Sequence, residues 1–335
     1  MRCVLTSSLK VVALGVAIVW ITAAPLAAQT GTAAAKPSAG ANAWTAPKTA
    51  WGHPDLQGTW TNTTTTPLER LPEAADKQTL SNEERADLAK KVAQRVNADV
   101  RRPGQVGAYN EFWFERGTLN TRTSLLVDPP DGKVPPYTPV AQKLWETIDA
   151  ARKAHPADSW LDRSSYDRCI TRGMPGAMMP GFYNHNYHIM QTPTYVAIVV
   201  EMIHDARIIP LDGRPHLGAG LTQWLGDSRG HFEGDTLVVE TTNLTDKVFE
   251  RGVTVTAFGS GWKLVERFRR VDADTIDYQF TINDPRIFTK PWTVAAPMSR
   301  SDGRLFEYAC HEGNYAMPHI LSAARSEEQE AAQKK

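Results

Sequence analysis

From residue 183 onward, apolar and polar residues alternate along the chain with a period of two. In residues 275–283 every second position is apolar, from Ile276 to Ile282, and the positions between are polar. This alternation is typical of a strand with one buried and one exposed face. Similar short runs, each a predicted strand, occur at residues 185–192, 195–209, 229–233, 236–243, 262–271, 288–298 and 304–310.

Short turn sequences separate several of these runs, among them LDGR, EGDT, DADT and SDGR. Strands joined by short turns form antiparallel hairpins, and no helical pattern lies between them. We therefore expect a mainly β fold in which an antiparallel meander closes into a barrel, with a β-sandwich as the alternative.

Two helices are expected before this meander. The segment Ser81-Asn-Glu-Glu84 has the pattern of a capping box, and it predicts a helix that ends near residue 97. Thr138-Pro139 predicts a capped helix that ends near residue 153. We interpret residues 80–155 as a helical insertion in the N-terminal half of the β-rich domain.

The N-terminus has the composition of an export signal. A short basic segment is followed by an apolar run and by small residues as far as Ala28, so residues 1–28 are expected to be a cleaved signal peptide. Residues 29–47 are expected to be a disordered linker, residues 48–323 a single β-rich domain, and residues 324–335 a C-terminal helix or tail. The protein is thus predicted to be periplasmic or secreted, with no membrane span after cleavage.

The charge of the exported chain bears on its partners. Residues 1–28 contain two basic and no acidic residues, which leaves 35 Lys and Arg against 37 Asp and Glu. Near-neutrality argues against nucleic acid as a partner. Because the chain lacks a G-x-x-x-x-G-K-[ST] motif and a strand-linked G-x-G-x-x-G motif, we expect no nucleotide, and we predict no other cofactor.

Cys169 and Cys310 are the cysteines that remain after cleavage of the signal. In an oxidising compartment, two cysteines more often form a structural disulfide than a metal or catalytic site. A disulfide is therefore our prediction, and two buried free thiols are the alternative.

Residues 226–230 spell G-x-S-x-G, the motif of a serine-hydrolase nucleophile elbow. Gly234-Asp235 is, however, a two-residue hairpin signal, which pairs Arg229 with Glu240 and leaves no helix after the serine. In that register Ser228 faces away from the neighbouring histidine and aspartate. We therefore interpret Ser228 as a hydroxyl that lines a pocket.

A better candidate for chemistry is the pair of runs on either side of Pro193-Thr194. If these two residues form the turn, one face of the hairpin is apolar and carries two imidazoles, two phenols and a thioether, from Tyr183, His185, Tyr187, Met202 and His204. We predict these residues as ligand-binding, and His204, His185 and Tyr187 as candidates for acid–base catalysis. One extra turn residue would replace the set with Asn184, Asn186 and His188.

Two further groups of residues have a weaker pattern. The segment YNEFWFERG around Trp113 predicts either an aromatic plug or a stacking surface for an aromatic or sugar-like ligand. The histidines include an H-x-x-H pair, His185 and His188, whose side chains lie on opposite faces of a strand, and the loop CHEGNYAMPH contributes three more possible ligands. We predict no metal site.

Several segments resemble those of a family of uncharacterised exported bacterial proteins, notably PDLQGTWTN, RTSLLVDPPDGK, EMIHDARIIPLDGRPHL and YACHEGNY. That resemblance implies no activity and no catalytic residues. In addition, Gly58 and Trp60 resemble the G-x-W signature of lipocalin and calycin barrels. This local resemblance implies a tryptophan that plugs one end of a barrel.

Three functions agree with these observations. The first is an exported barrel that binds a small, partly apolar molecule in its interior. The second is a periplasmic hydrolase, isomerase or lyase with acid–base chemistry centred on His204. The third is a structural envelope protein without a pocket. We favour the first.

Overall fold

The computed structural model describes residues 44–74, 76–101, 110–247 and 261–334. The predicted signal peptide, residues 1–28, and most of the predicted linker lie outside the described residues. Two predicted helices are present with their predicted caps, α1 (Asn82–Val96) and α2 (Pro139–Ala154). A third helix, α3 (Ala316–Gln333), begins before the expected C-terminal segment.

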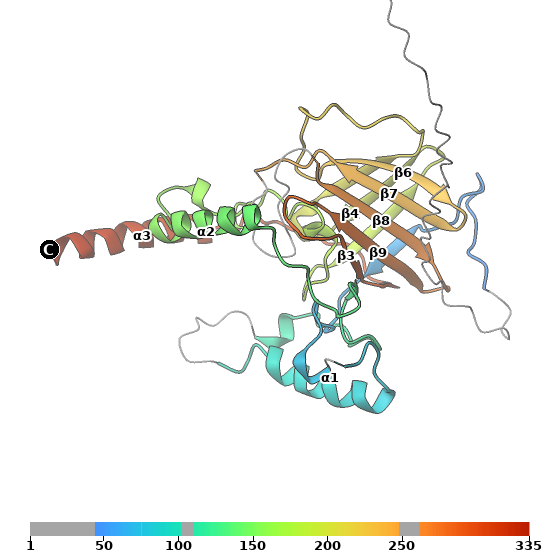
Figure 1. Cartoon of the computed structure of the whole chain (residues 1–335), viewed down its shortest axis with the longest axis horizontal. Helices are drawn as coiled ribbons and strands as arrows, with labels where there is room; N and C mark the ends of the chain where they lie inside the picture. Colours follow the sequence, from blue (N-terminus) through green and yellow to red (C-terminus); the bar gives the residue numbers. More distant parts are fainter. Residues whose placement is uncertain (1–43, 75, 102–109, 248–260, 335) are drawn as a thin grey trace, which may run out of the picture. The chain divides into compact units, whose positions relative to one another are not determined.

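The described strands form one antiparallel sheet. Nine of them follow one another across the sheet in the order β5-β4-β3-β1-β11-β9-β8-β7-β6, and β10 joins β9 to β2. Figure 1 labels β3, β4, β6, β7, β8 and β9 of this sheet. Their bounds are β1 Gly58–Thr61, β2 Leu126–Asp128, β3 Asn186–Gln191, β4 Tyr195–Val200, β5 Ala206–Pro210, β6 Asp227–Glu233, β7 Thr236–Thr242, β8 Lys263–Arg270, β9 Thr275–Asn283, β10 Trp292–Ala295 and β11 Met298–Arg300.

The two ends of this sheet, β5 and β6, lie against each other, so the nine strands form a nearly closed barrel. Gly230 on β6 shows how close they are: a Cβ there would lie 2.8 Å from Ile209 Cγ2 and 2.9 Å from Leu211 Cδ2. The mainly β, barrel-shaped prediction is confirmed. The local resemblance to lipocalins, by contrast, receives no further support.

Both hairpin registers predicted from two-residue turns are confirmed. Tyr187 lies opposite Val200 in the β3–β4 hairpin, and Arg229 lies opposite Glu240 in the β6–β7 hairpin. Turn length sets these registers, and the turn residue Gly234 has the positive φ of +58° that such a turn requires.

The prediction of a single strand over residues 195–209 is wrong. The chain turns at residues 201–205, where Ile203 and His204 have left-handed backbone conformations with φ of +59° and +49°. The turn reverses the faces that follow it. As a result, Arg207 points into the barrel and His204 is exposed.

The expected strand at residues 304–310 is also absent, because this segment bonds to side chains rather than to a neighbouring strand. The Phe306 N–H donates to Glu201 Oε1 at 3.1 Å, and Cys310 forms the predicted disulfide with Cys169. The run 288–298 forms two short strands, β10 and β11, that are separated at Ala296-Pro297.

Large side chains fill the interior of the barrel. The alternation predicted for β9 is confirmed, with Ile276, Tyr278, Phe280 and Ile282 buried. The largest fully buried side chains on the strands are Trp60, Tyr187, Phe268, Tyr278, Phe280 and Trp292. Trp60 donates from Nε1 to the Leu56 carbonyl at 2.9 Å, and the Arg300 guanidinium lies 4.8 Å from its ring centre.

One ion pair crosses this interior. Arg207 on β5 donates from Nη1 to Glu266 Oε1 on β8 at 2.9 Å, and both side chains are fully buried. Tyr278 also donates to Glu266 Oε1 at 2.9 Å, and its phenol stays neutral because burial, together with the nearby carboxylate, raises its pKa. Arg207 Nη2 lies 3.5 Å from Ser228 Oγ on β6. Arg207 therefore bridges the two ends of the sheet.

Removing one partner of this pair should destabilise the protein strongly. Glu266→Ala leaves the Arg207 charge buried and uncompensated, so we expect a loss of about 3–5 kcal/mol in the free energy of unfolding, measured by urea denaturation. Glu233→Ala, which removes the partner of the exposed Arg267, should cost far less. The double variant Arg207→Met/Glu266→Leu should recover most of the loss. Equal losses for Glu266→Ala and Glu233→Ala would contradict this role.

Candidate ligand-binding site

Ser228 of the G-x-S-x-G segment lies on β6 and points into the barrel. Its Oγ lies 2.8 Å from Thr241 Oγ1 and 3.5 Å from Arg207 Nη2, and neither partner can act as a base. The interpretation of this segment as the entry to a hairpin agrees with these contacts. Ser228 takes part in the buried network and lies apart from the cavity described below.

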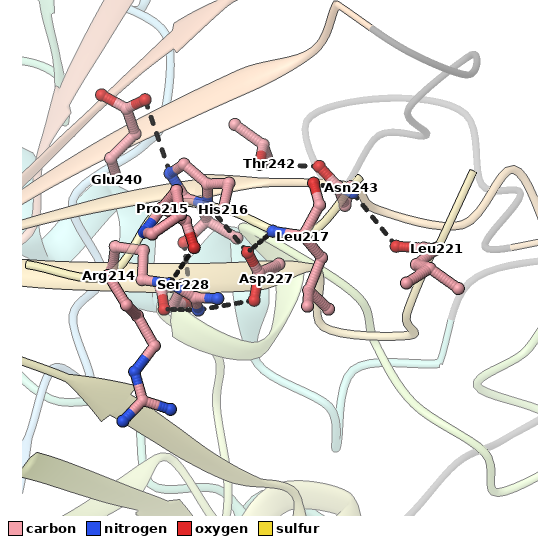
Figure 2. A network of polar contacts seen from close by, with 12 residues as sticks. Arg214, Pro215, His216, Leu217, Leu221, Asp227, Ser228, Glu240, Thr242 and Asn243 are labelled. Atoms are coloured by element: carbon pink, nitrogen blue, oxygen red, sulfur yellow. Dashed lines mark hydrogen bonds and ion pairs between the residues drawn. The ribbon is translucent and has the colours of Figure 1, made fainter. Parts of the chain in front are cut away.

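The aspartate of the same segment, Asp227, faces the other side of the sheet (Figure 2). Its Oδ2 accepts from His216 Nδ1 at 2.9 Å and from the Leu217 N–H at 3.0 Å, and its Oδ1 accepts from Arg229 at 2.6 Å. Burial would raise the pKa of Asp227, but these hydrogen bonds outweigh it and lower the pKa. Because His216 Nε2 lies 3.6 Å from Glu240, both ring nitrogens face carboxylates. This network fixes the loop before β6 to the sheet.

His185 and Tyr187, two predicted catalytic residues, are buried side by side. His185 Nε2 accepts from Arg172 Nη1 at 3.1 Å, and burial, aided by the Arg172 charge, lowers the pKa of His185 to about 3. Tyr187 donates to Asn62 Oδ1 at 3.2 Å, and burial raises its pKa. Both groups are therefore neutral at pH 7 and engaged with protein partners.

His204 and Met202 lie in the turn between β4 and β5, so the strand face predicted for them does not exist. The imidazole of His204 is exposed and donates from Nδ1 to the Tyr308 carbonyl at 3.1 Å. Met202 is buried, and its Sδ lies 3.8 Å from the Tyr166 hydroxyl. Both residues therefore contact tyrosines, Tyr308 and Tyr166, that line the cavity described next, but they do not line it themselves.

A cavity of about 680 Å³ opens at this end of the barrel, next to the Cys169–Cys310 disulfide. Its aromatic lining comes from Trp113, Tyr166, Tyr183 and Tyr308. The hydroxyls of Tyr166 and Tyr183 are 3.1 Å apart, and burial raises the pKa of Tyr166, so this phenol is neutral at pH 7. Met317 and Ile320 of α3 contribute apolar surface.

Segments far apart in the sequence form the walls of this cavity. One wall contains Trp113 together with lining residues from 166–169 and 183–184, and the other contains lining residues from 307–310 and 313–320. The disulfide joins the walls, and Asn314 Nδ2 donates across them to the Asp167 carbonyl at 2.9 Å. The cavity is therefore held open by covalent and polar contacts rather than by loop packing alone.

The predicted ligand-binding residues divide into three groups. Trp113 and Tyr183 line the cavity, Met202 and His204 support its wall, and His185, Tyr187 and Ser228 are enclosed in the protein. The prediction did not include Tyr166, Tyr308 or Glu307. Their positions within three residues of Cys169 or Cys310 were the available signal, because the predicted disulfide brings their segments together.

Comparisons with protein-family models, with curated proteins and with solved structures found no match. Among the described residues, no group of three or more His, Cys, Asp or Glu side chains is arranged to hold a metal ion. In that same part of the chain, no helix is both long and apolar enough to cross a membrane.

The low pKa of His185 should make stability depend on pH. Below pH 6.5, the pKa of this imidazole in the unfolded chain, unfolded His185 binds a proton, whereas folded His185 binds one only near pH 3 and below. Stability therefore falls as the pH falls through this window. In wild type this group should account for a loss of roughly 3 kcal/mol between pH 7 and pH 4.5.

His185→Gln should remove that loss, which urea denaturation at both pH values can measure. Burial raises the pKa of Asp205 to about 6, which acts in the opposite direction, but Asp205 is present in both proteins and cancels in the comparison. An unchanged pH slope in the variant would show that His185 is not held neutral.

Proposed function

We propose that the protein binds a small, partly apolar molecule in the cavity beside the disulfide, rather than inside the barrel. The observation that carries this proposal is the cavity itself, whose volume of about 680 Å³ is typical of small-molecule sites. Four aromatic side chains supply stacking surface, and tyrosine hydroxyls and asparagine amides supply hydrogen bonds. The barrel interior, by contrast, is occupied by the protein's own aromatic residues.

Binding is better supported than acid–base catalysis. His204 faces a backbone carbonyl, and the imidazole of His185 is engaged with Arg172. The phenol of Tyr166 is neutral at pH 7, so it can donate a hydrogen bond but is a poor base. A purely structural role would leave the aromatic lining of the cavity unexplained.

We further propose that this binding takes place outside the cytoplasm. The disulfide supports this location, because such bridges form and persist in oxidising compartments. The export signal expected at residues 1–28 supports it independently.

The neutral fluorescent probe N-phenyl-1-naphthylamine tests the binding site. Its fluorescence should rise on binding, and Trp113→Ala and Met317→Ala, one on each wall, should each weaken its affinity by roughly tenfold, about 1.4 kcal/mol. Trp160→Ala is the matched control, because Trp160 is an exposed tryptophan that does not line the cavity. Equal affinity in all three variants and wild type would place binding elsewhere.

A further inference from the structure

The charged side chains that line the cavity are of one sign. Its ionisable lining residues, apart from tyrosines, are Asp167 and Glu307, and no Lys, Arg or His is among the lining residues that the structure describes. The phenol of Tyr166 is neutral at pH 7, and the carboxylates give the lining a negative charge.

The two carboxylates differ in their surroundings. Asp167 lies 3.1 Å from Arg163 Nη2, which offsets its charge. Glu307 is exposed at the cavity and forms no ion pair with any residue in the described ranges. Arg172 lies 5.5 Å from the Tyr166 ring centre, and its Nη1 is directed to His185 Nε2 at 3.1 Å. Glu307 therefore determines the sign of the charge that a ligand meets.

The aromatic lining favours the same sign. The faces of indole and phenol rings carry partial negative charge and attract ammonium groups, and the attraction increases as water is excluded. Such faces also bury the apolar part of a ligand. An anionic ligand would gain the apolar contact but would be repelled by Glu307.

We propose that the ligand is an organic cation, an amine or quaternary ammonium group attached to an apolar body, and that Glu307 with the rings of Trp113, Tyr166, Tyr183 and Tyr308 selects it. This inference rests on the proposed binding function and names its ligand class. It assigns Glu307 a specificity-determining role.

Three compounds with similar apolar bodies and different charges test this inference. Benzyltrimethylammonium, 2-phenylethanol and phenylacetate are titrated into the full disulfide-bonded protein by calorimetry. We expect the cation to bind best and the anion worst, with a ratio of at least about tenfold between them. The preference should shrink between about 50 mM and 500 mM salt, because partly exposed charges are screened.

Two isosteric variants test whether Glu307 causes the preference for a cationic ligand. Glu307→Gln should weaken binding of benzyltrimethylammonium by roughly threefold to tenfold and leave 2-phenylethanol unchanged. Glu312→Gln, the same change nearby in the same loop but outside the lining, should affect neither compound.

Two results would overturn the assignment: affinity for 2-phenylethanol or phenylacetate equal to that for the cation, or equal effects of Glu307→Gln and Glu312→Gln. Either result, with N-phenyl-1-naphthylamine still bound in a Trp113-dependent way, would refute the charge preference and leave the binding function intact. Loss of both the probe signal and the cation signal would refute both.

Discussion

The buried pair of Arg207 and Glu266 is the interaction on which the rest of the structure depends. The edge strands β5 and β6 of the nine-strand path are not hydrogen-bonded neighbours. Another interaction must therefore hold them together to close the barrel. Arg207 belongs to the edge strand β5, and its partner Glu266 lies on β8, two strands in from the opposite edge. Buried charges are stable only when they are paired, so this ion pair favours the approach of the two sheet edges, β5 and β6.

The turn that lets Arg207 point inward also helps to position the cavity. Arg207 can point inward only because the chain turns at residues 201–205 and reverses the faces of β5. The turn presents Glu201 to the Phe306 amide and His204 to the Tyr308 carbonyl. These two contacts position the loop that forms one wall of the cavity. Barrel closure and the candidate binding site are thus linked through one short turn.

Much of the fold could be predicted from local patterns. Period-two alternation predicted β9, and two-residue turns predicted the registers of the β3–β4 and β6–β7 hairpins, because turn length fixes pairing between adjacent strands. The turn at Ile203 and His204 could not be predicted in this way. It contains no Gly or Pro, and the apolar pattern continues through it, so only tertiary contacts could hold these residues at positive φ. For this reason His204 is exposed in a turn, whereas the sequence predicted it on a strand face that points inward.

The disulfide makes the formation of the cavity depend on oxidation. Residues 166–169 and 307–310 are remote in the chain, and the bond between Cys169 and Cys310 joins them directly. While both thiols are reduced, hydrogen bonds and the packing of Tyr308 against the core are left to hold the second wall in place. Under the proposed export and binding function, the newly made chain would reach the oxidising compartment with its barrel folded and this wall less constrained. The proposed ligand binding would then increase on oxidation, after the chain has left the cytoplasm.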